Sequence, residues 1–266
     1  MPSATAQISN KKAGCDHPSQ RTGSKLILCA QDLKKVYGGR AVVDGVSMTV
    51  GEAEIVGLLG PNGAGKTTTF YMIAGLVPPN AGVVTFNGQE ITTLPMHKRA
   101  RIGMGYLPQE ESIFRKLSVQ ENLIAVLETR KDLNRKQRKE KAEQLMERFR
   151  ITKLRNSQAL TLSGGEKRRL TIARCLCTEP KLLMLDEPFA GVDPKAVEDI
   201  HTIVSELRDK DRLSILITDH HVRETLKIVD HAYVMDDGKA ILEGTADEIA
   251  NNPLARKHYL GEDFVL

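Results

Sequence analysis

Short runs of consecutive apolar residues recur along the chain, each followed by a turn or a polar segment. The clearest runs cover residues 54–59, 182–185 and 214–218. Strands that are apolar on both faces are typical of a parallel sheet with helices on both sides. A glycine-rich loop follows the first run, and residues 67–76 can continue from it as a helix. These patterns predict an α/β domain built on a buried parallel sheet.

Hairpin signals stand near both ends of the chain. Residues 26–50 are β-prone with glycine-containing turns, and residues 83–86 run into Asn87-Gly88. Asn-Gly between β-prone segments favours a tight hairpin turn. Further on, two short apolar segments flank Asp237-Gly238. We therefore predict an antiparallel β layer near the start and a closing hairpin later.

The middle of the chain has a helical pattern instead. Ser118 is followed three residues later by Glu121, the spacing of a capping box, so a helix begins directly after it. Residues 135–149 carry apolar positions at helical spacing among Lys and Glu, which predicts a second amphipathic helix. We expect residues from about 114 to 165 to form a helical subdomain inserted into a domain that spans residues 25–266.

Composition and charge exclude some functions. The 266 residues are 41% apolar, enough for a sizeable core, and 38 basic against 34 acidic side chains leave a formal charge of +4. A charge this small and dispersed does not indicate a nucleic-acid partner. No apolar run approaches the roughly 18 residues that cross a bilayer. Residues 1–24 lack a signal-peptide core and predict a disordered extension. The four cysteines form no CxxC pair, which favours reduced thiols and the cytoplasm.

One loop has the pattern of a phosphate-binding site. It follows the first buried strand and fits G-x-x-x-x-G-K-[ST]. Glycines let backbone amides converge on phosphate oxygens, the lysine reaches the β and γ phosphates, and the hydroxyl of Thr67 holds Mg²⁺. The position between a strand and a helix sets this loop apart from chance matches. The predicted nucleotide-binding residues here are Gly60, Pro61, Asn62, Gly63, Ala64, Gly65, Lys66, Thr67 and Thr68.

Two adjacent carboxylates end the second apolar run. Asp186 and Glu187 stand where an α/β sheet binds its ligands, at the carboxyl end of a strand. Asp186 is the candidate Mg²⁺ ligand. Successive residues of a strand point to opposite sides, so Glu187 can instead act as general base toward an attacking water.

A third motif indicates the family. The residues Leu162-Ser163-Gly164-Gly165-Glu166 precede an apolar stripe at helical spacing. This segment matches the signature of ATP-binding cassette (ABC) ATPases, and with the other two motifs in order the chain resembles that family. The serine and the glycine amides at a helix N-terminus can form a second anion site. The resemblance implies an ABC-type P-loop fold, Mg-ATP hydrolysis, and two copies that sandwich ATP.

The remaining family positions follow in order. Tyr37 occupies the place of the aromatic residue that stacks on adenine, and Gln109 resembles the glutamine that touches Mg²⁺ and the attacking water. Asp193 belongs to a segment like the D-loop of the family. His220 resembles the switch histidine that contacts the γ-phosphate, and we interpret the neighbouring His221 as a bystander.

The sequences of two segments indicate which kind of ABC ATPase the chain resembles. The segments GYLPQEESIFRKLSV and YLGEDFVL resemble the ATPase subunits of lipopolysaccharide exporters. The ATPases of branched-chain amino-acid importers share much of the sequence of the core motifs and remain the alternative. A soluble, non-transport ABC ATPase is a weaker alternative. The sequence departs from the family at Ala53, where glycine is usual, outside the phosphate loop.

The resemblance also implies partners. Two membrane-spanning subunits would dock near Phe114 and Arg115, so the chain would lie on the cytoplasmic face of the inner membrane. The transported lipid would contact these partners and not this chain. Alternatively, Phe114 anchors the helical insertion to the core.

Overall fold

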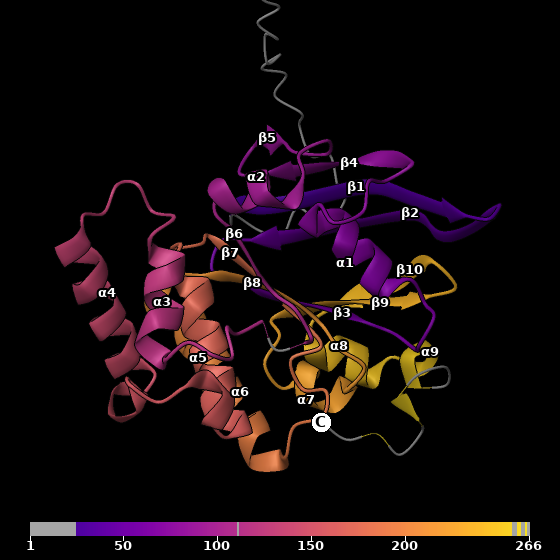
Figure 1. The fold of residues 1–266 in the computed structure, drawn as a ribbon. Helices are drawn as coiled ribbons and strands as arrows, with labels where there is room; N and C mark the ends of the chain where they lie inside the picture. The colour runs from indigo at the N-terminus through magenta and orange to yellow at the C-terminus, as the bar shows by residue number, and fades with distance from the viewer. Residues whose placement is uncertain (1–24, 111, 257–259, 262–263, 265–266) are drawn as a thin grey trace, which may run out of the picture.

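The computed structural model describes residues 25–110, 112–256, 260–261 and 264, so the predicted N-terminal extension lies outside the described residues. Its strands form two sheets (Figure 1). The first sheet is antiparallel, in the order β2-β1-β4-β5, which confirms the predicted β layer. Its strands are β1 (Leu26–Tyr37), β2 (Arg40–Gly51), β4 (Ala81–Phe86) and β5 (Gln89–Glu90).

The second sheet has six strands in the order β10-β9-β3-β8-β7-β6. All neighbours pair in parallel except the β9–β10 hairpin, which turns at the predicted Asp237-Gly238. The three apolar runs are confirmed as strands of this sheet. Its strands are β3 (Ile55–Leu59), β6 (Met104–Leu107), β7 (Leu182–Asp186), β8 (Ser214–Thr218), β9 (His231–Asp236) and β10 (Lys239–Gly244).

Burial on both faces explains the continuous apolar runs. In β3, Ile55 and Leu59 belong to one hydrophobic cluster and Val56 and Leu58 to the other. The second cluster lies between the two sheets and includes helix α1 (Lys66–Ala74). The helix that follows the phosphate loop is therefore enclosed by the core.

A buried arginine fixes the far end of α1. Arg99 belongs to α2 (Met96–Arg101), a helix rich in charged residues, yet it is only 1% exposed. Its guanidinium donates hydrogen bonds to four backbone carbonyls, and burial lowers its pKa to about 10. Two of these carbonyls, of Met72 and Ile73, lie in the last turn of α1. A cation at a helix C-terminus is favourable to the helix dipole.

The helices α3 (Val119–Leu127), α4 (Arg135–Arg148) and α5 (Gly164–Leu176) pack on one another at one side of the molecule (Figure 1, left). The capping box of Ser118 and Glu121 is present, as predicted, and the second predicted helix begins at its expected residue. The subdomain limits of about 114 and 165 stay a prediction, and α5 extends the helical group beyond them.

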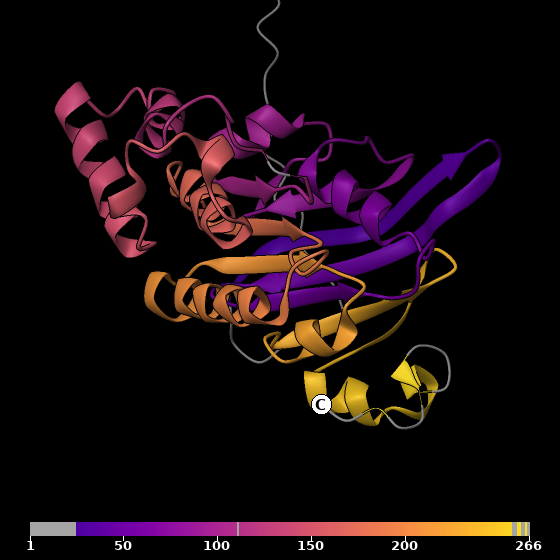
Figure 2. The same cartoon turned by 60° about the horizontal axis from the view of Figure 1, so that its bottom comes forward.

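The remaining helices pack along the sheet from its β8 strand to its β10 edge. Figure 2 shows the yellow C-terminal helices apart from the pink helical group. Phe264 packs partly buried against the core, and the guanidinium of Arg223 lies 5.8 Å from its ring centre. These helices are α6 (Pro194–Asp211), α7 (Val222–Leu226), α8 (Ala246–Asn251) and α9 (Pro253–Ala255), and two 3₁₀ turns cover Thr152–Leu154 and Ala159–Thr161.

The cysteines, Ala53 and the apolar content of the helices can each be compared with the sequence predictions. Cys175 and Cys177 are free thiols, but Cys29 is disulfide-bonded, so the expectation of reduced thiols is wrong for Cys29. Ala53 has a φ of 54°, a left-handed conformation that favours glycine, which explains why glycine is usual there. No helix in the described part of the chain is long and apolar enough to cross a membrane.

Candidate active site

The phosphate loop connects the fully buried β3 to α1. Gly60 has a φ of 143°, and a Cβ there would lie 2.2 Å from the carbonyl oxygen of Met235. Gly65 has a φ of 97°, and its Cβ would lie 2.5 Å from the carbonyl oxygen of Val42. These separations exclude any side chain. Both ends of the loop are therefore fixed against neighbouring strands.

The loop can receive anionic oxygens. Gly65 is the N-cap of α1 and gives no side-chain hydrogen bond, so the first-turn N–H groups are left for a ligand. Lys66 is 5% exposed, and its ammonium donates to the carbonyls of Gly60 and Pro61 at 2.7 and 2.9 Å. Burial lowers the pKa of Lys66, while the charges of Glu187 and Asp219 act in the opposite direction. All nine predicted residues lie in this loop and the first turn of α1.

The two carboxylates at the end of β7 have different surroundings. Asp186 is 4% exposed and accepts a hydrogen bond from the Tyr106 hydroxyl at 3.2 Å. Burial and the nearby charge of Glu187 raise the pKa of Asp186. A bound cation would relieve that cost, so this carboxylate fits Mg²⁺.

Glu187 meets the other predicted catalytic residues. Its φ is 44°, which bends the chain at the end of the strand, and its N–H donates to Thr218 O at 2.7 Å. The Gln109 amide donates to the Glu187 carboxylate at 3.0 Å, and His220 Nδ1 lies 3.3 Å from the same oxygen. The Glu187 side chain is 20% exposed, so water can reach it. Two residues that follow neighbouring strand ends, Gln109 and His220, thus converge on the Glu187 carboxylate.

The signature motif forms the N-terminus of α5. Ser163 is its N-cap, and with Glu166 it completes a capping box that sequence analysis did not identify at this helix. The carboxylate of Glu166 accepts both the N–H and the hydroxyl of Ser163 at 2.8 Å. The Ser163 N–H and hydroxyl and the Glu166 N–H are therefore satisfied from within, whereas no side chain caps α1.

A cleft of about 520 Å³ brings several predicted residues together. Asp193 is the N-cap of α6 and accepts from the N–H groups of Lys195 and Ala196 at 3.1 Å. The phosphate loop is not part of this lining. The predicted residues in it are Gln109, Ser163, Gly164, Gly165, Glu187 and Asp193.

Other predicted residues lie elsewhere. Tyr37 is 49% exposed at the end of β1, with the Lys35 ammonium 5.2 Å from its ring centre. A wider cleft of about 970 Å³ lies beside α2 and the α3–α4 connection and contains no predicted site residue, so volume alone does not locate the chemistry. Sequence reasoning missed Tyr106 and Asp219. The available signal was their place in the sequence: Tyr106 lies three residues before Gln109, and Asp219 directly precedes His220.

Comparisons with known proteins identify the family. The ABC transporter family profile matches residues 43–190, and the chain belongs to this family of ATP-binding cassettes. It is 55% identical to the lipopolysaccharide export system ATP-binding protein LptB of Haemophilus influenzae over 90% of this chain and 99% of that protein. Identity to LptB of Escherichia coli K12 is 56% over the same shares.

A solved structure shares the fold. The ADP conformation of MJ1267, an ATP-binding cassette of an ABC transporter, matches with a TM-score of 0.81 and 29% identity, covering 90% of this chain and all of that one. The predicted α/β P-loop fold of the ABC type is therefore confirmed. The chain is an ABC ATPase.

Proposed function

We propose that this chain hydrolyses ATP to drive a lipopolysaccharide export transporter. The observation that carries hydrolysis is the convergence of Gln109 and His220 on Glu187 at the sheet edge that also bears the phosphate loop. The exporter is supported by identities of 55% and 56% to LptB proteins over nearly their full length. A branched-chain amino-acid importer remains the alternative from the sequence, but no feature of the site favours it.

The phosphates would be held by the loop before α1. Its free N–H groups and the Lys66 ammonium suit the β and γ phosphates. Thr67, Gln109 and Asp186 would hold Mg²⁺, which fits because Asp186 is a buried carboxylate with a raised pKa. When bound, the ion neutralises charge on the phosphate oxygens.

Glu187 would take the proton from the water that attacks the γ-phosphorus, since it is a partly exposed carboxylate held by two neighbours. His220 would contact the γ-phosphate, and Gln109 would orient the water. The bond to the β-phosphate oxygen breaks, which releases ADP and inorganic phosphate.

Two copies would be needed for a complete site. Ser163, Gly164 and Gly165 line a cleft that excludes the phosphate loop of the same chain. The signature residues would therefore face phosphates bound at Lys66 of a second copy. Tyr37, at the exposed end of β1, would stack on the adenine of the ATP held by the phosphate loop of the same chain.

The loop before α3 would receive the membrane-spanning partners. Phe114 is 47% exposed, which disfavours a role as core anchor. Its N–H donates to Asn122 at 2.8 Å and its carbonyl accepts from Asn122 at 3.0 Å, and Asn122 is fully buried. The backbone is thus fixed while the ring and the neighbouring Arg115 face outward. This placement would keep the chain on the cytoplasmic face, with the lipid bound by its partners.

Replacing Glu187 with Gln tests the proposal. The variant keeps the shape of the side chain but cannot accept the proton, so ATP binding should persist while the turnover rate falls on the order of 100-fold or more. Binding is measured with a fluorescent ATP analogue and turnover by phosphate release. A variant with near-normal turnover would contradict hydrolysis at this site. Failure of the wild-type gene to restore growth of exporter-depleted cells would contradict the exporter alone.

A further inference from the structure

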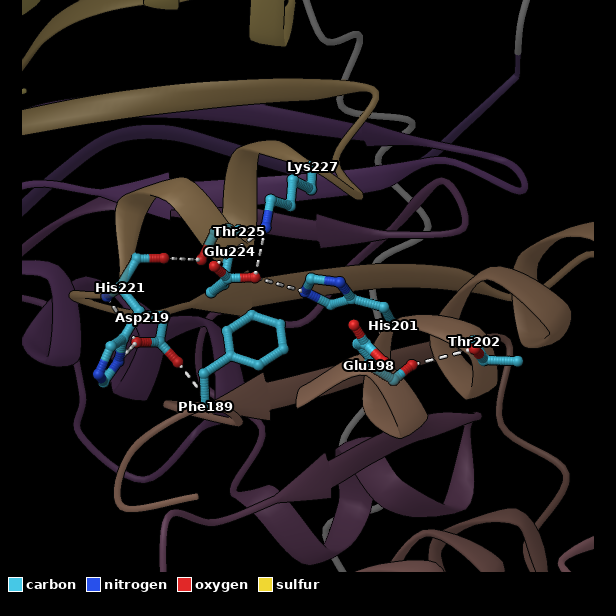
Figure 3. A network of polar contacts seen from close by, with 9 residues as sticks. All are labelled: Phe189, Glu198, His201, Thr202, Asp219, His221, Glu224, Thr225 and Lys227. Carbon is cyan, nitrogen blue, oxygen red and sulfur yellow. Dashed lines mark hydrogen bonds and ion pairs between the residues drawn. The ribbon is translucent and has the colours of Figure 1, made fainter. Parts of the chain in front are cut away.

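Asp219 is a fully buried carboxylate beside the candidate active site. It lies between the last residue of β8 and His220. One carboxylate oxygen accepts the N–H of Phe189 at 2.9 Å, and the other accepts the N–H of His221 at 2.8 Å and lies 2.8 Å from His221 Nδ1 (Figure 3). Three donors thus satisfy a charge that would be costly to bury alone.

These contacts join the two turns that carry the reacting groups. Phe189 follows Glu187 by two residues, and His221 directly follows His220. A backbone hydrogen bond from Glu187 N to Thr218 O, of 2.7 Å, connects the same two turns. Asp219 therefore fastens the segment of the general base to the segment of the histidine.

The contact also orients His221. A carboxylate can only accept, so Nδ1 of His221 carries the proton in this contact. The His221 ring lies 4.1 Å from the His220 ring, centre to centre, with 41° between their planes. His221 therefore supports the His220 ring, and its interpretation as a bystander does not describe its contacts.

Packing on the other side fixes Phe189. Its ring meets His201 of α6 edge to face at 5.1 Å, and His201 Nε2 lies 3.8 Å from the Glu224 carboxylate of α7 (Figure 3). The Phe189 N–H is thus aimed at Asp219 by residues of two helices. The network leaves the Asp219 carboxylate little freedom to turn.

We propose that Asp219, acting through His221 and directly on His220 Nδ1 at 3.7 Å, is a positioning residue that sets the His220 ring against Glu187. This inference rests on the proposed ATP hydrolysis at Glu187. The residue itself touches neither substrate nor metal in this role. Its loss should slow turnover and leave the affinity for ATP nearly unchanged.

The first test compares two aspartates that accept backbone N–H groups, one beside the candidate site and one away from it. Asp219→Asn keeps the size but cannot accept all three N–H groups, so kcat should fall on the order of tenfold to 100-fold with KM for ATP changed less than about twofold. Asp230→Asn is the control for losing a carboxylate that accepts a backbone N–H, because the exposed Asp230 accepts the N–H of Ile55 at 2.8 Å at the start of β3, the end away from the phosphate loop. It should keep kcat. Equal loss in both variants, or normal kcat in Asp219→Asn, would overturn the proposal.

A second test separates positioning from folding. His221→Phe keeps a ring beside His220 but cannot donate to Asp219, so its kcat should fall about as far as that of Asp219→Asn, and the double variant should be less than about twofold slower than either single variant. In a His220→Ala background, Asp219→Asn should cost less than about twofold, since there is no ring left to position. Losses that multiply would indicate a general structural role and overturn the proposal. If Glu187→Gln is inactive while Asp219→Asn is normal, this inference fails and the proposed function stands.

Discussion

Two helix N-termini take part in the candidate site, and they are built differently. α1 begins after Gly65 without a side-chain cap, so its first N–H groups are left for a ligand. α5 begins at Ser163, where the carboxylate of Glu166 already occupies the end of the helix. The first terminus is a prepared anion site. The second must exchange an internal contact for a ligand, so the two halves of the site are not equivalent.

The opposite ends of the two helices differ as well. The last turn of α1 is held by the buried Arg99. Near the end of α5, the Arg174 guanidinium lies 4.5 Å from the ring centre of Phe114 and donates to the Ser112 carbonyl. One half of the site is thus anchored in the core, and the other is connected to the proposed docking loop. A partner that moves this loop would act on the signature half.

The largest expected effect is a difference in ATP affinity between single substitutions at the two helix N-termini. Lys66→Ala should weaken ATP binding on the order of tenfold or more, because it removes a buried cation from the phosphate loop. Ser163→Ala should leave binding within about threefold, lower turnover on the order of tenfold and cost about 1 kcal/mol of helix capping. Titration with a fluorescent ATP analogue and phosphate release measure the two quantities. Equal binding defects would contradict the difference between the halves.

Mixing the two variants shows whether the halves come from different copies. A mixed dimer has one site with both faults and one with neither. We therefore expect phosphate release above that of either variant alone. No gain would mean that both sites must be intact for turnover, and full activity of either homodimer would refute the sandwich.

The next effect concerns the connection to the docking loop. Phe114→Ala should keep the ATPase rate of the free subunit within about twofold and lower the free energy of unfolding by less than about 1 kcal/mol, since the ring is half exposed. Assembly with membrane subunits should be lost, as measured by co-purification. Ile241→Ala is the control, because Ile241 is 46% exposed on β10. A large drop in the melting temperature would instead favour a core role for Phe114.

The smallest effect concerns the turn that leads into β3. Ala53 is held in a left-handed conformation that costs an L-residue about 1 kcal/mol. Glycine avoids this cost, but its greater freedom in the unfolded chain offsets part of the gain. Ala53→Gly should raise the free energy of unfolding by about 0.5 kcal/mol, measured by urea denaturation. The ATPase rate should not change, because the anchoring of α1 does not depend on this turn. A destabilised variant would contradict this explanation of why glycine is usual in the family at position 53.

The sequence predicted the parts of the molecule that depend on local patterns. The capping box of Ser118 and Glu121 located α3, and the apolar run 182–185 located β7. The order of strands explains why the site could also be inferred. Gln109, Glu187 and His220 each follow the end of a strand, and those three strands are neighbours in one sheet.

Contacts between distant residues could not be predicted in this way. The bond from Phe189 to Asp219 spans 30 residues and depends on how two turns meet. Arg99 lies in a helix that reads as a solvated surface, and only the packing of α1 explains its burial. The exposure of Phe114 was equally undetermined, because an aromatic residue suits a core as well as an interface.

The bend at Glu187 has an evolutionary consequence. A residue other than glycine or asparagine in a left-handed conformation carries a conformational cost, and here a φ of 44° falls on the proposed general base. Selection for heat resistance alone would therefore favour glycine at this position and yield sturdier but inactive proteins. Libraries screened only for stability should lose Glu187 early, whereas selection for growth should retain it.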